Sequence, residues 1–394
     1  MVKNGQVDIP RCPHHSCRSG PVSATGLCSC SRRASTSRCG DISKKRQISL
    51  KIVFLKISNI DTIKEEYSAD IFLSARWREP ALDSTNKVKI NWESYFDPKL
   101  NIQNNIGELK QTTWRELQTE AGGETYVMER RRIKGKFFEK LELQDFPFDI
   151  QDLSIHITSE SPPTDVELVE LNSTVSHVNV DSFVDQQEWG LYDFVVGEKR
   201  LTPNEYSSVK YKRPAMVFRC CAVRRVGYFT WNIMLVIAMI SSLAFATFSV
   251  DRKLPQNRLQ LSFTLVLTMV TFKFVASQSV PKLSYLTYLD RYILLSMSFL
   301  FLVCLWHAVV TLYNADAVTA GVMDYYAFFT FVGVYLFGQL TFILFVGTKF
   351  LIKKKQKERI EEEYQKKVES MPVENRPQQR KRRRKHLMKI TPFI

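Results

Sequence analysis

Charged residues are missing from three long runs of this 394-residue sequence. Residues 228–250, 292–315 and 325–348 contain no Asp, Glu, Lys or Arg, and residues 259–280 contain only Lys273. A helix of about 20 apolar residues crosses the ~30 Å hydrocarbon core of a bilayer. These runs exclude a soluble protein and predict four membrane-spanning helices, at about residues 228–250, 257–280, 290–314 and 325–350.

The sequence also lacks the motifs of an enzyme or a metalloprotein. No nucleophile–base pair or phosphate-binding loop is found, and His156, His177 and His307 each stand alone. Five of the eight cysteines lie in residues 1–41, but their spacing fits no standard zinc pattern. The same segment has no apolar core long enough for a signal peptide. We interpret residues 1–44 as a disordered or leader-like segment rich in Cys, Ser and Arg, and we expect neither a cofactor nor a metal.

The positive charge of the chain is confined to its two ends. The formal net charge is +15. Residues 1–47 hold nine Lys or Arg and two acids, and residues 349–394 hold sixteen and six, so the body between them is slightly negative. A fold that binds nucleic acid would carry the basic residues on its own surface. We therefore expect no nucleic-acid partner.

The N-terminal half predicts β-structure. Residues 47–58, 67–77 and 153–158 alternate apolar and polar side chains, and Pro- and Gly-rich turns separate such segments. Many short strands with regular turns favour an extracellular antiparallel β-sandwich of the immunoglobulin-like class, followed by an all-α four-helix transmembrane bundle. The sequon at Asn172 predicts glycosylation and gives weak support to an extracellular surface.

The stretch at residues 139–153, EKLELQDFPFDIQDL, places Pro147 between Phe146 and Phe148. The proline restricts its own φ and disfavours a helical Phe146, which predicts a tight turn with two aromatic side chains at its tip. Apolar side chains at a loop tip suggest docking on another element, such as a membrane helix. The alternative is an ordinary hairpin turn in a soluble sandwich.

Five motifs agree in order and spacing with one family of membrane receptors. They are Phe146-Pro147-Phe148-Asp149 with Gln151, Arg76-Trp77-Arg78-Glu79-Pro80, Phe96-Asp97-Pro98 with Asn104, Glu188-Trp189-Gly190, and Arg224-Arg225 with Tyr228. With four spans after them, residues 45–350 resemble the pentameric ligand-gated ion channels, or Cys-loop receptors. The two cysteines that close the family's signature loop are replaced by Glu139 and Leu153, and Val236 stands where the first membrane helix usually has proline.

The resemblance implies a coupling role for the turn. In the family the signature loop rests on the extracellular ends of the membrane helices. Phe146 and Phe148, held by Pro147, are then expected to contact the linker at residues 279–284. Asp149 is expected to pair with Arg224 at the top of the first span.

The resemblance also implies a ligand site between subunits. Its positions carry over to Phe72, Gln103, Glu160, Tyr206 and Tyr211. Family members hold cationic ligands against aromatic faces, and an acid at Glu160 favours an amine-bearing or otherwise amphipathic ligand. The alternative is that Glu160 only caps a turn before Pro162.

Helical spacing predicts a pore-lining stripe on the second span. Polar residues on a membrane helix usually face water or the bundle interior, although small polar residues also join helices together. Leu267 and Phe274 are expected to close the pore by dewetting. The stripe with its cytoplasmic mouth consists of Asn257, Gln260, Thr264, Leu267, Thr271, Phe274 and Gln278.

Ion selectivity follows, in the family, from charge near the cytoplasmic mouth. Cation-selective members carry Glu before the basic residue that opens the second helix, and anion-selective members carry Pro-Ala. Here Gln256 and Asn257 precede Arg258, so neither pattern applies. Neutral polar rings lead us to expect weak cation selectivity.

We expect a plasma-membrane, multi-pass receptor whose N-terminal domain is extracellular. Its predicted parts are residues 1–44, a ligand-binding sandwich at 45–225, a pore domain at 226–352 and a basic, partly helical tail at 353–394. The expected partners are a small-molecule agonist, permeant monovalent ions, membrane lipids and related subunits in a homo- or hetero-pentamer. An alternative is a ligand-sensing subunit that does not conduct as a homomer. An extracellular basic tail conflicts with the positive-inside tendency.

Overall fold

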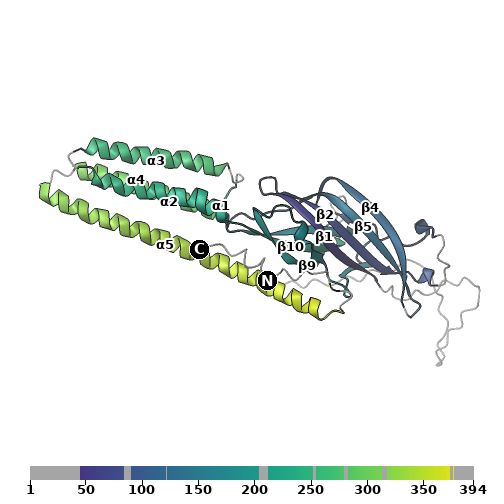
Figure 1. Ribbon diagram of the computed structural model, residues 1–394. Helices are drawn as coiled ribbons and strands as arrows, with labels where there is room; N and C mark the ends of the chain where they lie inside the picture. The colour runs from purple at the N-terminus through teal and green to yellow at the C-terminus, as the bar shows by residue number, and fades with distance from the viewer. Residues whose placement is uncertain are drawn as a thin grey trace, which may run out of the picture. The chain divides into compact units, whose positions relative to one another are not determined.

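The computed structural model describes residues 45–83, 90–120, 122–203, 212–251, 254–278, 283–312, 317–372 and 376. Ten strands come first along the chain and four membrane-length helical segments follow (Figure 1). The predicted order of a β-sandwich and a helical bundle is confirmed.

Two sheets make up the sandwich. One has the order β4-β5-β2-β1-β7, with β8 also paired to β1, and the other has the order β3-β6-β10-β9. Neighbours are antiparallel except β7 and β8, which run parallel to β1, so the expected all-antiparallel pairing is wrong at that edge. The parallel pairing arises because the chain crosses from β6 to the other sheet instead of turning back as a hairpin. The strands are β1 (Arg46–Asp61), β2 (Glu66–Arg78), β3 (Leu100–Ile102), β4 (Asn105–Thr119), β5 (Thr125–Phe138), β6 (Ile150–Ser159), β7 (Val166–Glu170), β8 (His177–Val178), β9 (Trp189–Pro203) and β10 (Lys212–Arg224).

Alternation along the strands builds the core between the sheets. In β2 every second residue from Tyr67 to Trp77 is buried, and the intervening residues are partly exposed. Because successive side chains of a strand point to opposite faces, this pattern buries one face of the sheet. Trp77 and Trp189, from different sheets, are among the largest fully buried side chains.

The first membrane span is helical but not uniformly α-helical. It consists of α1 (Gly227–Phe229), a π-helical turn at Thr230–Met234, α2 (Leu235–Ser242) and a 3₁₀ segment at Leu243–Ser249. A π turn widens the helix locally by one extra residue. The irregularity lies just before Val236, the position where proline was expected from the family.

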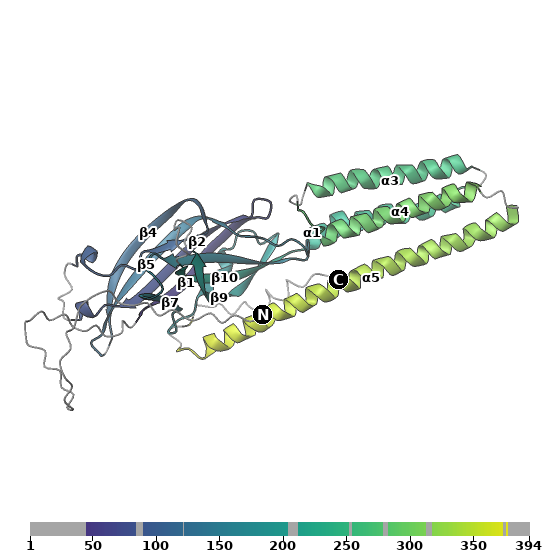
Figure 2. The ribbon, with the colours of Figure 1, turned by 180° about the vertical axis from the view of Figure 1, so that it is seen from behind.

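The remaining spans are α3 (Pro255–Ser277), α4 (Tyr288–Leu312) and α5 (Ala317–Glu369). All four candidate spans are long and apolar enough to cross a membrane. Figure 2 shows α4 between α3 and α5, and α4 packs against both. A shared cluster from all four spans, including Ile237, Met269, Ile293 and Phe331, holds them together.

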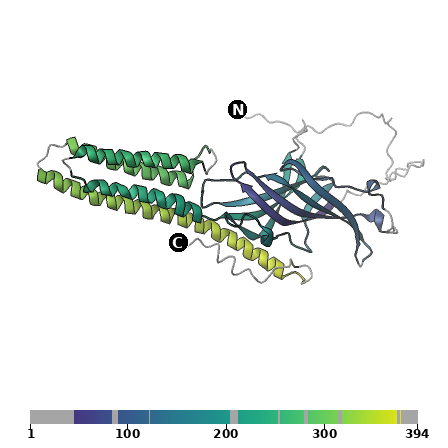
Figure 3. The same cartoon turned by 45° about the horizontal axis from the view of Figure 1, so that its top comes forward.

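The helix α5 is much longer than a membrane requires. Its 53 residues correspond to a length of about 80 Å, whereas the hydrocarbon core is ~30 Å thick. Its last turns pack against the sandwich, where Tyr364 and Val368 share a cluster with Tyr192, Phe194 and Val223 (Figure 3). The part of the chain after residue 352 is therefore helical as far as Glu369 and partly buried as far as Met371.

Candidate functional site

The turn at residues 146–149, called here the coupling turn, is buried rather than exposed. Phe146 precedes Pro147 through a cis peptide bond and is 1% exposed. The centroids of the Phe146 ring and the Phe229 ring of α1 are 4.7 Å apart in a T-shaped arrangement. The Phe146 carbonyl oxygen accepts a hydrogen bond from the Leu289 N–H of α4 at 3.2 Å. The turn thus contacts both the first and the third span.

Asp149 and Arg224 form the ion pair that the sequence predicted. Arg224 Nε donates to Asp149 Oδ1 at 2.7 Å, and the two side chains are 7% and 1% exposed. Gln151 donates to the other carboxylate oxygen at 2.7 Å. The guanidinium also lies 4.2 Å from the Trp189 ring and 4.9 Å from the Phe146 ring. The pair is buried, and both carboxylate oxygens of Asp149 accept hydrogen bonds. The role of the pair in coupling remains a prediction.

Phe148 has a partner that the sequence did not indicate. Its ring lies 6.2 Å from Phe350 of α5 in an edge-on arrangement. The expected contact surface at residues 279–284 is described only from Leu283 onward, and Leu283 packs against the cluster that contains Phe146. Tyr285 of the same linker accepts the Leu143 N–H at 3.2 Å.

Polar contacts stand where the family has its disulfide. The Glu139 carboxylate accepts the Ser154 N–H at 2.7 Å, and Leu153 is fully buried opposite Cys220 of β10. Burial raises the pKa of Glu139, and the hydrogen bonds from Ser154 oppose that shift. This end of the loop is therefore closed by hydrogen bonds and packing.

The predicted stripe lies within the exposed part of α3, which also includes Leu261, Phe263 and Val275. Leu267 and Phe274 are 67% and 68% exposed, and the polar members of the stripe, Gln260, Thr264, Thr271 and Gln278, are exposed as well, as is Asn257. The opposite face, with Ser262, Met269 and Ala276, is buried against the other spans. Both faces follow from the helical period alone.

Arg258 at the start of α3 points into the protein. It pairs with Asp324 of α5 at 2.9 Å and donates to the carbonyl oxygens of Phe248 and Val250. Since this guanidinium is buried, its charge is not displayed on the stripe. Among the described residues of this end, the neutral Gln256 and Asn257 are exposed, and so is Asp251 before the helix.

One predicted ligand residue, Phe72 on β2, lies in an aromatic and basic face. Its ring is 5.7 Å from Trp114 of β4. Arg132 stands opposite Phe72 and Arg130 opposite Trp114 in the strand register, so the four side chains share one face. Arg132 pairs with Asp70 at 2.8 Å but is 60% exposed. The sequence reasoning missed Trp114 and the arginines, although the run of three arginines at residues 130–132 was a usable signal, because the first and third residues of such a run share one face of a strand.

Two other predicted ligand residues, Gln103 and Glu160, directly follow strands of the second sheet. Gln103 follows β3, and Glu160 follows β6 with its carboxylate 3.9 Å from the Lys99 ammonium. The carboxylate therefore faces a cation of a neighbouring loop, in place of the turn cap considered from sequence. Tyr206 and Tyr211 lie outside the described residues.

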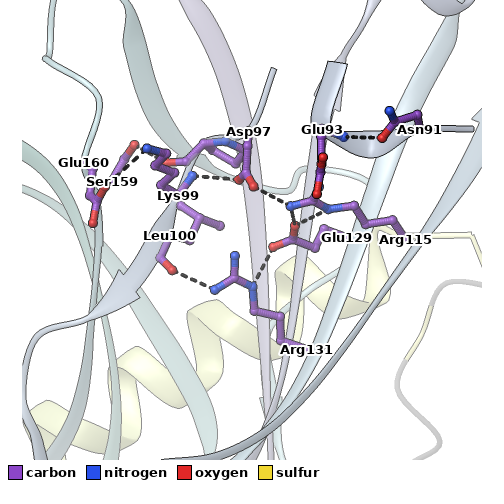
Figure 4. A network of polar contacts seen from close by, with 11 residues as sticks. Asn91, Glu93, Asp97, Lys99, Leu100, Arg115, Glu129, Arg131, Ser159 and Glu160 are labelled. Carbon is purple, nitrogen blue, oxygen red and sulfur yellow. Dashed lines mark hydrogen bonds and ion pairs between the residues drawn. The ribbon is translucent and has the colours of Figure 1, made fainter. Parts of the chain in front are cut away.

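A buried ionic network connects strands β4 and β5 with the loop that contains Asp97 and Lys99 (Figure 4). The fully buried Glu129 carboxylate accepts from Arg115 at 2.7 Å and from Arg131 at 2.6 Å. Arg115 also pairs with Asp97 at 2.8 Å, and Arg131 donates to the Leu100 carbonyl oxygen at 2.7 Å. Although partial burial opposes it, the hydrogen bond from Arg115 lowers the pKa of Asp97. The network joins β4 and β5 to the loop beside Glu160.

Three further positions lie outside these regions. Asn172 is exposed in the turn after β7, and its glycosylation stays a prediction. Cys220 and Cys221 are buried free thiols of β10. Among the described residues, no group of three or more His, Cys, Asp or Glu could hold a metal ion.

Two family models match the chain. The model of the neurotransmitter-gated ion-channel ligand binding domain matches residues 35–225, and that of the neurotransmitter-gated ion-channel transmembrane region matches residues 237–316. Together they cover more than half of the chain. Both describe a receptor channel and not an enzyme.

Individual relatives agree with these matches. The chain is 22% identical over 272 residues to a gamma-aminobutyric acid receptor subunit beta of Caenorhabditis elegans, covering 67% of this chain and 48% of the nematode protein. It is 25% identical over 288 residues to the human gamma-aminobutyric acid receptor subunit gamma-3, covering 69% and 59%. The chain thus spans about half the length of the curated relatives it matches. It belongs to the neurotransmitter-gated ion-channel family, the pentameric Cys-loop receptors, and is a multi-pass protein of the plasma membrane with an extracellular N-terminal domain.

Proposed function

We propose that the chain is a subunit of a pentameric ligand-gated ion channel whose pore is lined by α3. The polar stripe of α3 carries this proposal, because Gln260, Thr264, Thr271 and Gln278 are exposed on a membrane-spanning helix. Polar side chains are costly against lipid and are better placed around a water-filled axis. Five copies of Leu267 would form an apolar constriction that keeps the resting pore dry.

Accessibility of neighbouring positions to a charged thiol reagent tests this proposal. Thr271 and Val270 are both exposed, but they point about 100° apart around the helix. Thr271→Cys should react with a cationic methanethiosulfonate during channel opening and block the current, whereas Val270→Cys should be unaffected. Equal block at both positions, or block at neither, would contradict a pore on this stripe and favour helix–helix contacts.

The proposed parts of the chain follow from the same division. The sandwich at residues 45–225 binds the ligand, residues 226–352 form the ion pore within the membrane lipids, and residues 353–394 form a basic, partly helical tail. The predicted leader-like segment at residues 1–44 lies outside the described residues.

For the ligand we propose a small amine-bearing molecule that also carries a carboxylate. Glu160 follows β6 and Phe72 lies on β2, a strand of the other sheet, and we propose that Glu160 of one copy faces Phe72 of the next. The Glu160 carboxylate suits an ammonium, while Arg130 beside Trp114 suits a carboxylate. The relatives named as gamma-aminobutyric acid receptor subunits support an amino acid of this class. Gln103, Tyr206 and Tyr211 complete the proposed site.

Three ligands separate the two recognition elements. Gamma-aminobutyric acid should raise the melting temperature of the purified protein and evoke current. Butylamine, which lacks the carboxylate, and butyrate, which lacks the amine, should each act only at much higher concentration. Arg130→Gln should weaken the amino acid but not butylamine, and Glu160→Gln should weaken both amine-bearing ligands. An affinity for gamma-aminobutyric acid that is unchanged in both Arg130→Gln and Glu160→Gln would contradict this site.

Assembly and selectivity are the finer parts of the proposal. We favour a homo-pentamer, and the alternative is a ligand-sensing subunit that conducts only beside a related chain. Expression alone, followed by particle stoichiometry and ligand-evoked current, separates the two. A weak preference for monovalent cations rests only on the neutral residues at the mouth of α3, and nothing in the comparisons supports it. A reversal potential that follows the chloride gradient would reject it.

A further inference from the structure

The end of α5 carries an apolar face that matches one surface of the sandwich. We call residues 353–371 the outer segment. Ile360, Tyr364, Val368 and Met371 recur at helical spacing and pack against the sandwich. The surface that they cover consists of Val175, Ser176, Tyr192, Phe194, Cys221 and Val223.

Polar contacts give this packing a fixed register. The Tyr364 hydroxyl donates to the Ser176 carbonyl oxygen at 2.8 Å. Lys357 pairs with Asp152 of β6 at 2.8 Å, and Lys367 pairs with Glu170 of β7 at 3.3 Å. A helix that slid by one turn would lose these contacts together, so the docking is specific.

The ion pairs of the outer segment also bracket the coupling turn. Lys353 pairs with Asp145, the residue before Phe146, and Lys357 pairs with Asp152, three residues after Asp149. The turn is thus contacted by α1 and α4 through Phe146 and by α5 through the two acids beside it. A displacement of the turn must either break these pairs or carry the outer segment along.

We propose that the outer segment is a reversible extracellular clamp, which docks on β9 and β10 and sets how easily the coupling turn moves. The effect on opening rests on the proposed channel function, whereas the docking does not. The segment suits a reversible role because its contacts combine a modest apolar face with half-exposed ion pairs, which are weak singly. Regions held in this way open locally more often than a domain core.

Cys221 reports on the docking. Its thiol donates to Asp152 at 2.6 Å beneath Lys357, and burial together with the Asp152 charge raises its pKa to about 12. The neighbouring Cys220 is fully buried in the sandwich core and serves as an internal control. Iodoacetamide at pH 8, read by tandem mass spectrometry on the full chain, should therefore modify neither thiol while the segment is docked.

Two variants should release the segment. Lys357→Glu places an acid against Asp152, and Tyr364→Ala removes the hydrogen bond and the central apolar contact. Each should label Cys221 about tenfold faster, because Lys357→Glu replaces an ion pair by a repulsion and Tyr364→Ala loses a hydrogen bond and an apolar contact, with Cys220 still protected. Lys355→Glu is the matched control, because Lys355 is an exposed lysine of the same segment. Protection of Cys221 in both releasing variants, or equal labelling in Lys355→Glu, would overturn the docking.

Ligand-evoked currents test the effect on opening. Lys357→Glu and Tyr364→Ala should shift the half-maximal ligand concentration at least threefold relative to Lys355→Glu. Faster labelling of Cys221 without such a shift would overturn the clamp as a regulator. Absence of current in the wild type would contradict the proposed function, while the labelling result would still decide whether the segment docks.

Discussion

Neutralising Asp149 is the sharpest test of the coupling turn. Asp149→Asn keeps the size of the side chain and the backbone bond from the Arg224 N–H to the Asp149 carbonyl oxygen. It removes the counter-charge of a guanidinium that is only 7% exposed. The variant therefore leaves a buried, unpaired cation at the junction of the sandwich and the membrane helices.

The magnitude follows from the surroundings of Arg224. Breaking one side of a buried ion pair costs about 3–5 kcal/mol. Trp189 and Phe146 lie against the Arg224 guanidinium, and their cation–π contacts offset ~1 kcal/mol of this loss. We therefore expect a loss of ~3 kcal/mol, or a fall in melting temperature of roughly 5–10 °C for a domain of this size.

Thermal melting of the purified protein and ligand-evoked current measure the two consequences. Asp149→Asn should lower the melting temperature and reduce the maximal current more than it changes ligand affinity. The double variant with Arg224→Gln should recover part of the melting temperature, since no unpaired charge is left. Glu167→Gln breaks the exposed pair with Lys199 and should cost less than about 1 kcal/mol. Melting of Asp149→Asn within error of Glu167→Gln, or strictly additive effects in the double variant, would refute the reasoning.

Four further predictions concern single residues. Leu267→Thr should hydrate the constriction and give leak current or a leftward-shifted response, and an unchanged closed state would count against Leu267 as the gate. Asn257→Glu should move the reversal potential in a salt gradient towards the cation value, and the absence of any shift would remove Asn257 from the filter. Glu129→Gln leaves Arg115 and Arg131 without their shared carboxylate, so melting should fall by the equivalent of ~3 kcal/mol, and an unchanged melting temperature would show that the network is dispensable. Glu139 has a raised pKa, so its ionisation costs stability as the pH rises above ~4.3, the ordinary glutamate value. Glu139→Gln should therefore melt above the wild type at pH 8 and equal to it near pH 4, and a constant difference would contradict that linkage.

Local sequence patterns were sufficient to predict the spans and most of the strands. Charged residues are excluded from hydrocarbon whatever the surrounding fold, so charge-free runs such as residues 292–315 identify membrane helices directly. The period of a helix alone places Leu267 and Phe274 on one face, and both are exposed in the structure, while their role in lining a pore stays a prediction. The pair between Asp149 and Arg224 was predictable for another reason, since the motifs that contain both residues resemble a known family.

Contacts between distant segments had no such local signal. The partner of Phe148 is Phe350, far along the chain, and the carboxylate of Glu129 is held by Arg131 of its own strand and by Arg115 of β4, which in turn pairs with Asp97 of a loop. No spacing rule relates residues that meet only when separate elements pack. Phe148 was therefore assigned to the linker, and the network was missed.

The outer segment shows where the sequence and the tertiary structure each decide. The residues after 352 indicate a helix by their composition and spacing, but their lysines argued against an extracellular position. Only the folded sandwich brings Asp145, Asp152 and Glu170 to those lysines. The sequence by itself determined that the segment is helical and amphipathic, because both properties depend on neighbours within a few residues. The tertiary structure decided where the segment docks, because docking depends on charged and apolar side chains that lie about 200 residues away in the sequence.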